Sequence, residues 1–442
     1  MPADYDSCCT RVSKQWNSFI ASLPNLWSIL DLSEAKKPVK NDFLSLCLNR
    51  SARNISAAYL KRLQGSEKAI TAIVRHCKRL HTLSIVDGGV RSPDFIHQLY
   101  PARSLTTLKL GRDSPMSLDS VTVLLRELTN LKHIEIHSVM TNTYPATWIG
   151  EYPNLEVLIL HASSSTGDYT LLTLQELIKR TPELRNLTIS HFQSRSTARL
   201  DLKLHCPKLE IFDMKTCDLV RLGAPPFVLP PTLRIFRTST GIPSLSRTLA
   251  AMLTNGYMSN LPSLQELEIG DPLVASILLD NKKILDFLPE DDRESWMANA
   301  DNSDIFNTEV DCLSHLHTLS LNVKGDGEFV PNLLSCPRLM TLQNLRLTGT
   351  YVIDDSCAQQ IARNFPDLQY LDLSATAITG FGVKQIVNGC QKLRHLRLVA
   401  CERCGGDAIE WARTKGLSVD FAMNPGTKGK GSDRKVIRYD SY

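Results

Sequence analysis

The sequence lacks the features that mark several large functional classes. No apolar run reaches the roughly 18 residues that a membrane-spanning helix needs, and the first residues, Met1–Asp6, lack the basic and apolar segments of a secretory signal. The formal net charge is only +4, which does not by itself predict nucleic-acid binding. We therefore expect no membrane association, no direct nucleic-acid contact and a reducing compartment in which the 12 cysteines stay unpaired.

Signatures of catalysis and of cofactor binding are missing as well. The chain contains no GxxxxGK[ST], GxGxxG, HExxH or GxSxG motif. Cys401 and Cys404 form a CxxC pair, but a zinc site needs four ligands, and only Cys390 and His395 are near them in the sequence. We interpret these cysteines as structural, with Cys401 facing inward. We expect no catalytic residue, no cofactor, no metal and no small-molecule substrate.

One pattern, LxxLxL, recurs along the chain. Its cleanest copy is Leu368–Leu373, and most copies begin 24 to 26 residues after the previous one, with a helical pattern between them. Each unit is therefore a strand, a turn and a helix that cannot bury its apolar side alone, which is typical of stacked leucine-rich repeats. The copies begin at Leu80, Leu105, Leu131, Leu155, Leu184, Leu209, Leu233, Leu264, Leu316, Leu342, Leu368 and Leu393.

The pattern predicts an α/β leucine-rich-repeat solenoid, with a curved parallel sheet on the concave side and helices outside. The solenoid is expected over 80–423, after a small helical cap at 1–33 and a transitional helical or degenerate repeat at 34–79. An acidic insertion at 271–312 is either a degenerate repeat with a solvated loop or an arm that contacts a basic partner. The basic tail at 424–442 is expected to be flexible, with nuclear import or a contact with the last repeats as alternatives.

Side-chain alternation predicts which residues line the concave face. In LxxLxL, numbered 1 to 6, positions 4 and 6 point into the core and positions 3, 5 and 7 point away from it. Tyrosine and arginine often anchor protein interfaces, and clustered exposed aliphatic residues often need a cover. The alternative is a solvated sheet face with charges paired across strands. The predicted partner-binding residues are Arg346, Tyr370, Asp372, His395 and Arg397, and a second, apolar patch comprises Val157, Ile159, Ile211 and Ile235.

The N-terminal residues resemble part of a known motif. Arg11–Ile20 reads RVSKQWNSFI, and it is followed by SLPNLW at Ser22–Trp27 and LDLS at Leu30–Ser33. This stretch resembles the C-terminal half of an F-box and its exit into leucine-rich repeats, as in a fungal group that carries tetratricopeptide repeats, an F-box and leucine-rich repeats. The first half of the motif is missing, so we expect the chain to be an N-terminally truncated form.

The resemblance implies a role in ubiquitination. Proteins of this group resemble substrate receptors of cullin–RING (SCF) ubiquitin ligases, in which the F-box binds a Skp-family adaptor, which links it to the cullin, and the repeats bind a protein substrate. By match to the motif, Val12, Trp16 and Ile20 would lie on the adaptor-facing or linker-packing side. The resemblance further implies a nuclear location, with cytoplasm as the alternative, and substrates linked to chromatin or replication.

Three functions are therefore open. The leading hypothesis is a non-catalytic substrate receptor of a ubiquitin ligase. The second is a leucine-rich-repeat scaffold for protein–protein interaction that is unconnected to ubiquitination. The third, a GTPase-activating leucine-rich-repeat protein, is disfavoured because such proteins tend to carry longer repeats and an acidic tail, whereas this tail is basic.

Overall fold

The computed structural model divides the chain into two compact units, residues 1–316 and 317–442. Within the described residues, no helix is both long and apolar enough to span a bilayer. The predicted cap residues 1–27, the acidic insertion and the tail lie outside the described part. The structure describes residues 28–34, 44–45, 47–49, 52–61, 66–86, 95–140, 150–164, 170–192, 200–215, 217, 227–239, 261–270, 315–322 and 330–422.

The first unit is a parallel sheet whose strands follow one another in chain order. Its strands are β1 (Ile29–Leu32), β2 (Ala57–Lys61), β3 (Thr82–Val86), β4 (Thr107–Leu110), β6 (His133–Met140), β7 (Val157–Ser164), β8 (Asn186–Ser190), β10 (Ile211–Lys215), β12 (Ile235–Ser239) and β13 (Glu266–Ile269). The two-residue strand β5 (Met116–Ser117) pairs with β6, and β9 (Leu200–Asp201) pairs with β11 (Phe227–Val228).

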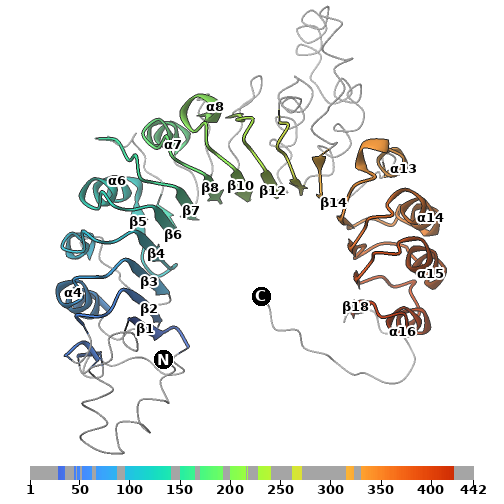
Figure 1. Cartoon of the computed structure of the whole chain (residues 1–442), viewed down its shortest axis with the longest axis horizontal. Coiled ribbons are helices and arrows are strands. Elements are labelled where there is room, and N and C mark those ends of the chain that lie inside the picture. Colours follow the sequence, from blue (N-terminus) through green and yellow to red (C-terminus); the bar gives the residue numbers. More distant parts are fainter. Residues whose placement is uncertain are drawn as a thin grey trace, which may run out of the picture. The chain divides into compact units, whose positions relative to one another are not determined.

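Helices of the first unit lie on one side of its sheet (Figure 1). They vary from 4 to 11 residues, because only the strand carries a strict apolar pattern in every repeat. The helices are α4 (Ser66–His76), α5 (Ile96–Leu99), α6 (Leu118–Glu127), α7 (Thr170–Ile178) and α8 (Leu202–His205).

The second unit repeats the arrangement with greater regularity. A parallel sheet again follows chain order, and the helices again lie on one side of it (Figure 1). Its elements are β14 (Thr318–Asn322), α13 (Val330–Leu334), the 3-10 turn η6 (Pro337–Leu339), β15 (Asn344–Thr348), α14 (Asp355–Asn364), β16 (Tyr370–Asp372), α15 (Gly380–Gly389), β17 (His395–Val399), α16 (Gly406–Thr414) and β18 (Ser418–Ala422).

The core of each unit lies between the sheet and its helices. Positions 1, 4 and 6 of the best-formed repeat, Leu368, Leu371 and Leu373, are all fully buried. A side-chain cap fixes the start of α14, where Asp354 accepts hydrogen bonds from the N–H groups of Ser356 and Cys357. The predicted leucine-rich-repeat fold is confirmed in each unit.

Most adjacent repeats within each unit are joined by the same backbone contacts. The carbonyl of position 2 in one repeat accepts the N–H groups of positions 2 and 3 in the next, as when Arg185 O accepts from Glu210 and Ile211 at 2.8 and 2.9 Å. Cys401, one residue beyond the turn that follows β17, is fully buried, and its thiol donates to Leu373 O at 3.0 Å. Its inward orientation is therefore as predicted.

Candidate functional site: the open face of the sheet

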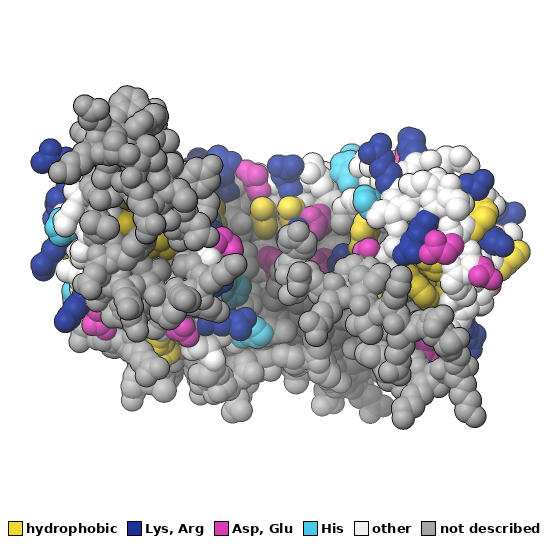
Figure 2. Space-filling model, turned by 90° about the horizontal axis from the view of Figure 1, so that it is seen from below, with side chains coloured by type: hydrophobic (Ala, Val, Ile, Leu, Met, Phe, Trp, Pro, Cys, Tyr) yellow, Lys and Arg dark blue, Asp and Glu magenta, His cyan; other side chains and the backbone are white. Residues whose placement is uncertain are grey.

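The face of each sheet that points away from the helices, here called the open face, carries the candidate site. In most repeats the side chains at positions 3 and 5 of LxxLxL are half-buried on this face, while those at positions 4 and 6 are buried on the opposite side. This alternation is the one that the sequence predicts. Basic, acidic and hydrophobic side chains are interspersed on the visible surface in Figure 2.

The second unit brings its five predicted residues together. Tyr370 lies beside His395 in the register of β16 and β17, and Asp372 lies between Arg346 of β15 and Arg397 of β17. All five are therefore on one face over three consecutive strands. They form a group whose two arginines lie on either side of one carboxylate.

Asp372 is the centre of this group, although it is only 4% exposed. Its Oδ1 accepts hydrogen bonds from the N–H and the hydroxyl of Ser374 at 3.0 and 2.6 Å. Its Oδ2 lies 3.2 Å from Nε of Arg346 and 4.0 Å from Nε of Arg397. Asp372 thus holds the arginine side chains from beneath, and its depth leaves little of its own surface for a partner.

The side chains above Asp372 are accessible. Those of Arg346 and Arg397 are 43% and 46% exposed, and His395 is exposed as well. The guanidinium carbon of Arg346 lies 5.9 Å from the centroid of the Tyr370 ring, within the range of a cation–π contact. The group therefore presents two cationic side chains in defined positions.

The predicted apolar residues of the first unit lie on the open face as two pairs. Val157 and Ile159 occupy positions 3 and 5 of their repeat, on β7, and Ile211 and Ile235 are register neighbours on β10 and β12. The intervening strand β8 places the polar residues Asn186 and Thr188 between the pairs. All four aliphatic side chains are half-buried. An interface that used both pairs would also have to satisfy this polar strand.

A second arginine-centred group lies at the end of the first unit. Arg237 of β12 lies 2.7 Å from Glu266, 3.8 Å from Asp213 and 3.9 Å from Glu268. The hydrogen bond that Arg237 donates to Glu266 raises the pKa of Arg237; burial opposes this effect in part, and the charges of all three carboxylates support it. Here the carboxylates outnumber the arginine, which is the reverse of the balance around Asp372.

A histidine–glutamate cluster on β6 and β7 is a site that sequence reasoning missed. Nε2 of His137 lies 2.7 Å from Glu135, Nζ of Lys109 lies 2.8 Å from it, and Nε2 of His133 lies 3.7 Å from it. The neighbouring His133 and His137, and then Lys109, hold the pKa of the Glu135 carboxyl well below its usual range despite burial. The ring of His137 stacks on that of His161, with centroids 4.5 Å apart.

The signal for that cluster was present in the sequence. His133, Glu135 and His137 occupy positions 3, 5 and 7 of one repeat, so the alternation places all three on one face. His161 occupies position 7 of the next repeat and hydrogen-bonds Ser190 on β8. Among the described residues, no group of three or more His, Cys, Asp or Glu has metal-binding geometry.

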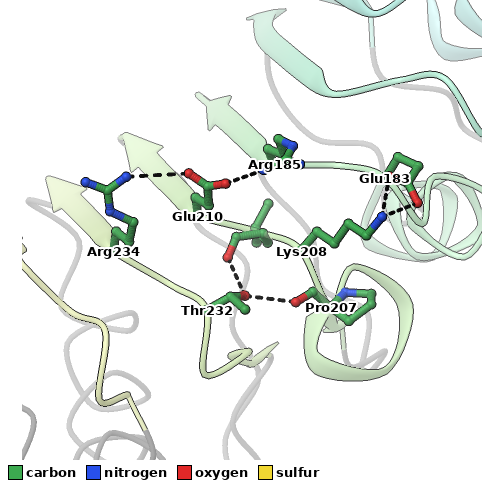
Figure 3. A network of polar contacts seen from close by, with 8 residues as sticks. Glu183, Arg185, Pro207, Lys208, Glu210, Thr232 and Arg234 are labelled. Atoms are coloured by element: carbon green, nitrogen blue, oxygen red, sulfur yellow. Dashed lines mark hydrogen bonds and ion pairs between the residues drawn. The ribbon is translucent and has the colours of Figure 1, made fainter.

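Charge pairs at the strand entrances connect consecutive repeats (Figure 3). Glu210 lies 2.6 Å from Arg185 and 3.7 Å from Arg234, while Lys208 lies 2.6 Å from Glu183. These side chains come from the same positions of successive repeats, so that each pair bridges two neighbours. Their exposure makes each pair worth at most about 1 kcal/mol, and their role is to support the stack.

Val12, Trp16 and Ile20 lie outside the described residues, so their adaptor-facing role stays a prediction. No family model matches the chain. Over 87 residues the chain is 28% identical to the F-box/TPR repeat protein pof3 of Schizosaccharomyces pombe, and the match spans 20% of this chain and 15% of pof3.

Two solved structures show a distant likeness to the chain. An internalin from Listeria monocytogenes covers 87% of this chain and 94% of its own, with 13% identity and a TM-score of 0.41. The complex of Rad7 and Elc1 from yeast covers 90% of this chain and 87% of the matched one, with 13% identity and a TM-score of 0.38. Scores this low add nothing to the fold described above. On its own repeats, parallel strands and buried leucines, the chain is a leucine-rich-repeat protein.

Proposed function

We propose that the chain is the substrate-recognition subunit of a cullin–RING ubiquitin ligase, with a protein substrate bound on the open face. The observation that carries the binding role is the open face itself. Its position 3 and 5 side chains are held in fixed register by the sheet, and the helices of each unit lie on the other side. A rigid strand array of this kind presents adjacent side chains to a partner without a large ordering cost.

The link to ubiquitination rests on the N-terminal residues and on one relative. Arg11–Ser33 resembles the end of an F-box, and pof3, to which part of the chain is similar, is named as an F-box protein. In this proposal Val12, Trp16 and Ile20 contact a Skp-family adaptor or pack beneath it. The adaptor connects the chain to a cullin.

The mechanism needs no catalytic residue in this chain. Holding a substrate beside a charged ubiquitin-transfer enzyme replaces a bimolecular encounter by an effectively intramolecular one. Tethering of this kind raises the local concentration to about the millimolar range for short connections, and orientation adds a further gain. A nuclear location and substrates linked to chromatin or replication are part of the same proposal.

Co-purification with a Skp-family adaptor tests the ubiquitin link. The full-length protein, with whatever precedes this chain in its gene, should capture the adaptor and a cullin. Replacing Val12 and Trp16 by alanine should abolish that capture, while Tyr370→Ala should leave it unchanged. Capture that is absent from the full-length protein, or that survives the double replacement, would rule out the adaptor role of these residues.

A scaffold without a ubiquitin ligase is the second candidate, since the open face is independent of the N-terminal residues. The two candidates differ in one outcome. A scaffold would retain its protein partner through the open face but would show no adaptor in the same complex. Measuring both partners in one purification, for wild type and for Tyr370→Ala, therefore separates the candidates.

A further inference from the structure

We propose that the basic tail, residues 424–442, docks on an apolar patch at one edge of the second unit. The patch comprises Tyr351, Val352 and Phe381 and is here called the strand-end patch. The tail lies outside the described residues, and its amino-acid sequence supplies its side of the argument. Because the inference concerns an edge of the sheet and not the open face, it is independent of the proposed function.

The first step is the exposure of the strand-end patch. Tyr351, Val352 and Phe381 are 72%, 43% and 64% exposed. Single exposed hydrophobic residues are ordinary on a protein surface, whereas several that gather on one part of it usually mark a contact with another segment or protein. An occupant that covered these side chains would remove their apolar surface from water.

The second step is that the three residues come from two turns that are joined to each other. Tyr351 and Val352 follow β15, and Phe381 is the second residue of α15, which follows β16. The N–H group of Ala377 donates to the carbonyl oxygen of Ile353 at 2.9 Å and so links the two turns. Because β15 and β16 are parallel, both turns lie at the edge of the sheet where the strands end.

The third step is the charge of this edge. The segments that follow β15, β16 and β17, up to the fourth residue of each helix, carry four carboxylates and one guanidinium. Within the described residues, no lysine or arginine forms an ion pair with any of these four carboxylates. The edge is therefore acidic and suits an occupant that is basic and partly apolar. Its charged residues are Asp354, Asp355, Glu402, Arg403 and Asp407.

The fourth step is that the tail has the complementary composition. It contains five basic and two acidic residues. Its stretch Arg434–Tyr439 reads RKVIRY, in which three apolar residues stand among three basic ones. The apolar side chains of this stretch can cover the strand-end patch while the basic ones face the acidic edge, an arrangement that fixes both position and specificity.

The fifth step is that the tail leaves the fold at the same edge. β18 ends at Ala422, and it lies three strands from β15 in the sheet, which is about 14 Å. Residues 423–435 can span about 40 Å when extended, so the RKVIRY stretch can reach the patch. The connection also keeps the local concentration of the tail at about the millimolar level, so that a modest contact is enough to hold it.

Limited digestion of the full chain with trypsin tests the docking. Trypsin cleaves after lysine and arginine, which occur in the docked stretch Arg434–Tyr439 and also before it, at Lys428. The first cut within the docked stretch, identified by mass spectrometry, tracks the undocked fraction. We expect Phe381→Ser and Tyr351→Ser each to accelerate this cut about tenfold or more, while the cut after Lys428 keeps its rate.

Met340→Ser is the matched control, because Met340 is 41% exposed in the same unit but precedes β15, at the opposite edge of the sheet. Its digestion should follow that of wild type. Equal rates within the docked stretch for wild type, Phe381→Ser and Tyr351→Ser would overturn the inference. Protection that disappears when the protein is diluted would also overturn it, because the patch would then hold the tail of a second copy. Circular dichroism establishes that each variant remains folded.

Discussion

At the residue scale, the turn after the strand carries a conformation that side chains rarely adopt. The eighth residue of four repeats has a left-handed backbone: Gly349 has φ 89°, Ala375 56°, Ala400 61° and His191 60°. Only glycine takes this conformation without strain, and other residues lose about 1–2 kcal/mol. Three of the four repeats therefore keep a strained residue where the fourth has a glycine.

Ala375→Gly should consequently stabilise the protein. Relief of strain is worth about 1–2 kcal/mol, and the extra backbone freedom of glycine in the unfolded chain removes about 0.5–1 kcal/mol of this gain. We expect the free energy of unfolding, measured by chemical denaturation, to rise by up to about 1 kcal/mol. Ala358→Gly, in the right-handed helix α14, is the control and should lower it. A loss of equal size in both variants would disprove the account.

Glu135 gives the folded protein a defined dependence on pH. The pKa of the Glu135 carboxyl is lowered in the folded state, chiefly by His133 and His137. The contribution of Glu135 to stability is therefore complete above the pKa of a glutamate in the unfolded chain, about 4.3. That contribution is lost as the pH falls below this value. Glu135→Gln should lower the free energy of unfolding at neutral pH by about 1.5–3 kcal/mol.

The difference between wild type and Glu135→Gln should then shrink as pH falls below about 4.3. Unfolding curves recorded for both proteins from neutral to acid pH provide the measurement. Glu410→Gln is the control, because the Glu410 side chain is 71% exposed and its curve should follow that of wild type. A difference that stays constant down to acid pH would mean that the Glu135 carboxylate contributes nothing as a charge.

Which residues face outward could be predicted from the sequence, whereas their depth could not. Alternation in LxxLxL correctly assigns Tyr370, Asp372 and Arg397 to the face opposite the core. The burial of Asp372 depends on two arginines from other strands folding over it and on Ser374, and a pattern within one repeat contains none of these contacts. Alternation within one repeat also places His133, Glu135 and His137 on one face, but it does not contain the contacts that Lys109 and His161 add from the neighbouring repeats.

At the scale of elements, α14 and α15 are packed so closely that one glycine is required. A Cβ on Gly389, the last residue of α15, would lie 2.5 Å from Cβ and 2.6 Å from the carbonyl oxygen of Ala362 on α14. Real side chains do not approach backbone atoms this closely. The absence of a side chain at Gly389 therefore allows α14 and α15 to pack at this short distance.

Gly389→Ala should destabilise the second unit by about 1–3 kcal/mol, the usual range for overpacking, although alanine is the better helix former by about 1 kcal/mol. Gly406→Ala, at the start of α16, is a matched control because an added Cβ there meets nothing within 4 Å. Thermal unfolding of the two variants, compared with wild type, measures the difference. Similar melting temperatures for both would show that the helices can separate at little cost.

Strands could be predicted more completely than helices. A strand must satisfy both the apolar pattern and the register with two neighbours, so the copies at Leu368 and Leu393 predict β16 and β17 closely. The outer segment of a repeat has to cover only one side of the core, and α5 and α8 are reduced to four residues each. Sequence periodicity cannot fix the length of an element that is so weakly constrained.

At the scale of the whole molecule, each repeat contacts chiefly its neighbours, so damage should stay local. Leu371→Ala removes a fully buried side chain of β16 and should cost about 2–5 kcal/mol. Amide hydrogen exchange should accelerate in β15, β16 and β17 and remain unchanged in β2, β3 and β4. Tyr370→Ala, one residue away on the open face, is the control and should change exchange little.

Uniform acceleration along the whole chain in Leu371→Ala would contradict this local behaviour and would mean that the molecule unfolds as one cooperative body. The fold as a whole could be predicted because the repeat is a property of spacing alone. The partner could not, because it depends on which side chains occupy positions 3 and 5, and those vary freely from one repeat to the next.

The uniform joint between repeats has a consequence for how such a chain changes over evolutionary time. Asn130 and Asn154 each donate a side-chain hydrogen bond to a carbonyl of the preceding repeat, at 2.8 and 3.0 Å, and Thr232 does so at 2.9 Å. A gene duplication that copies one whole repeat would create a new junction with the same donors and acceptors already in place. The length of the binding surface can therefore grow or shrink by whole units, while the chemistry of each unit is selected separately.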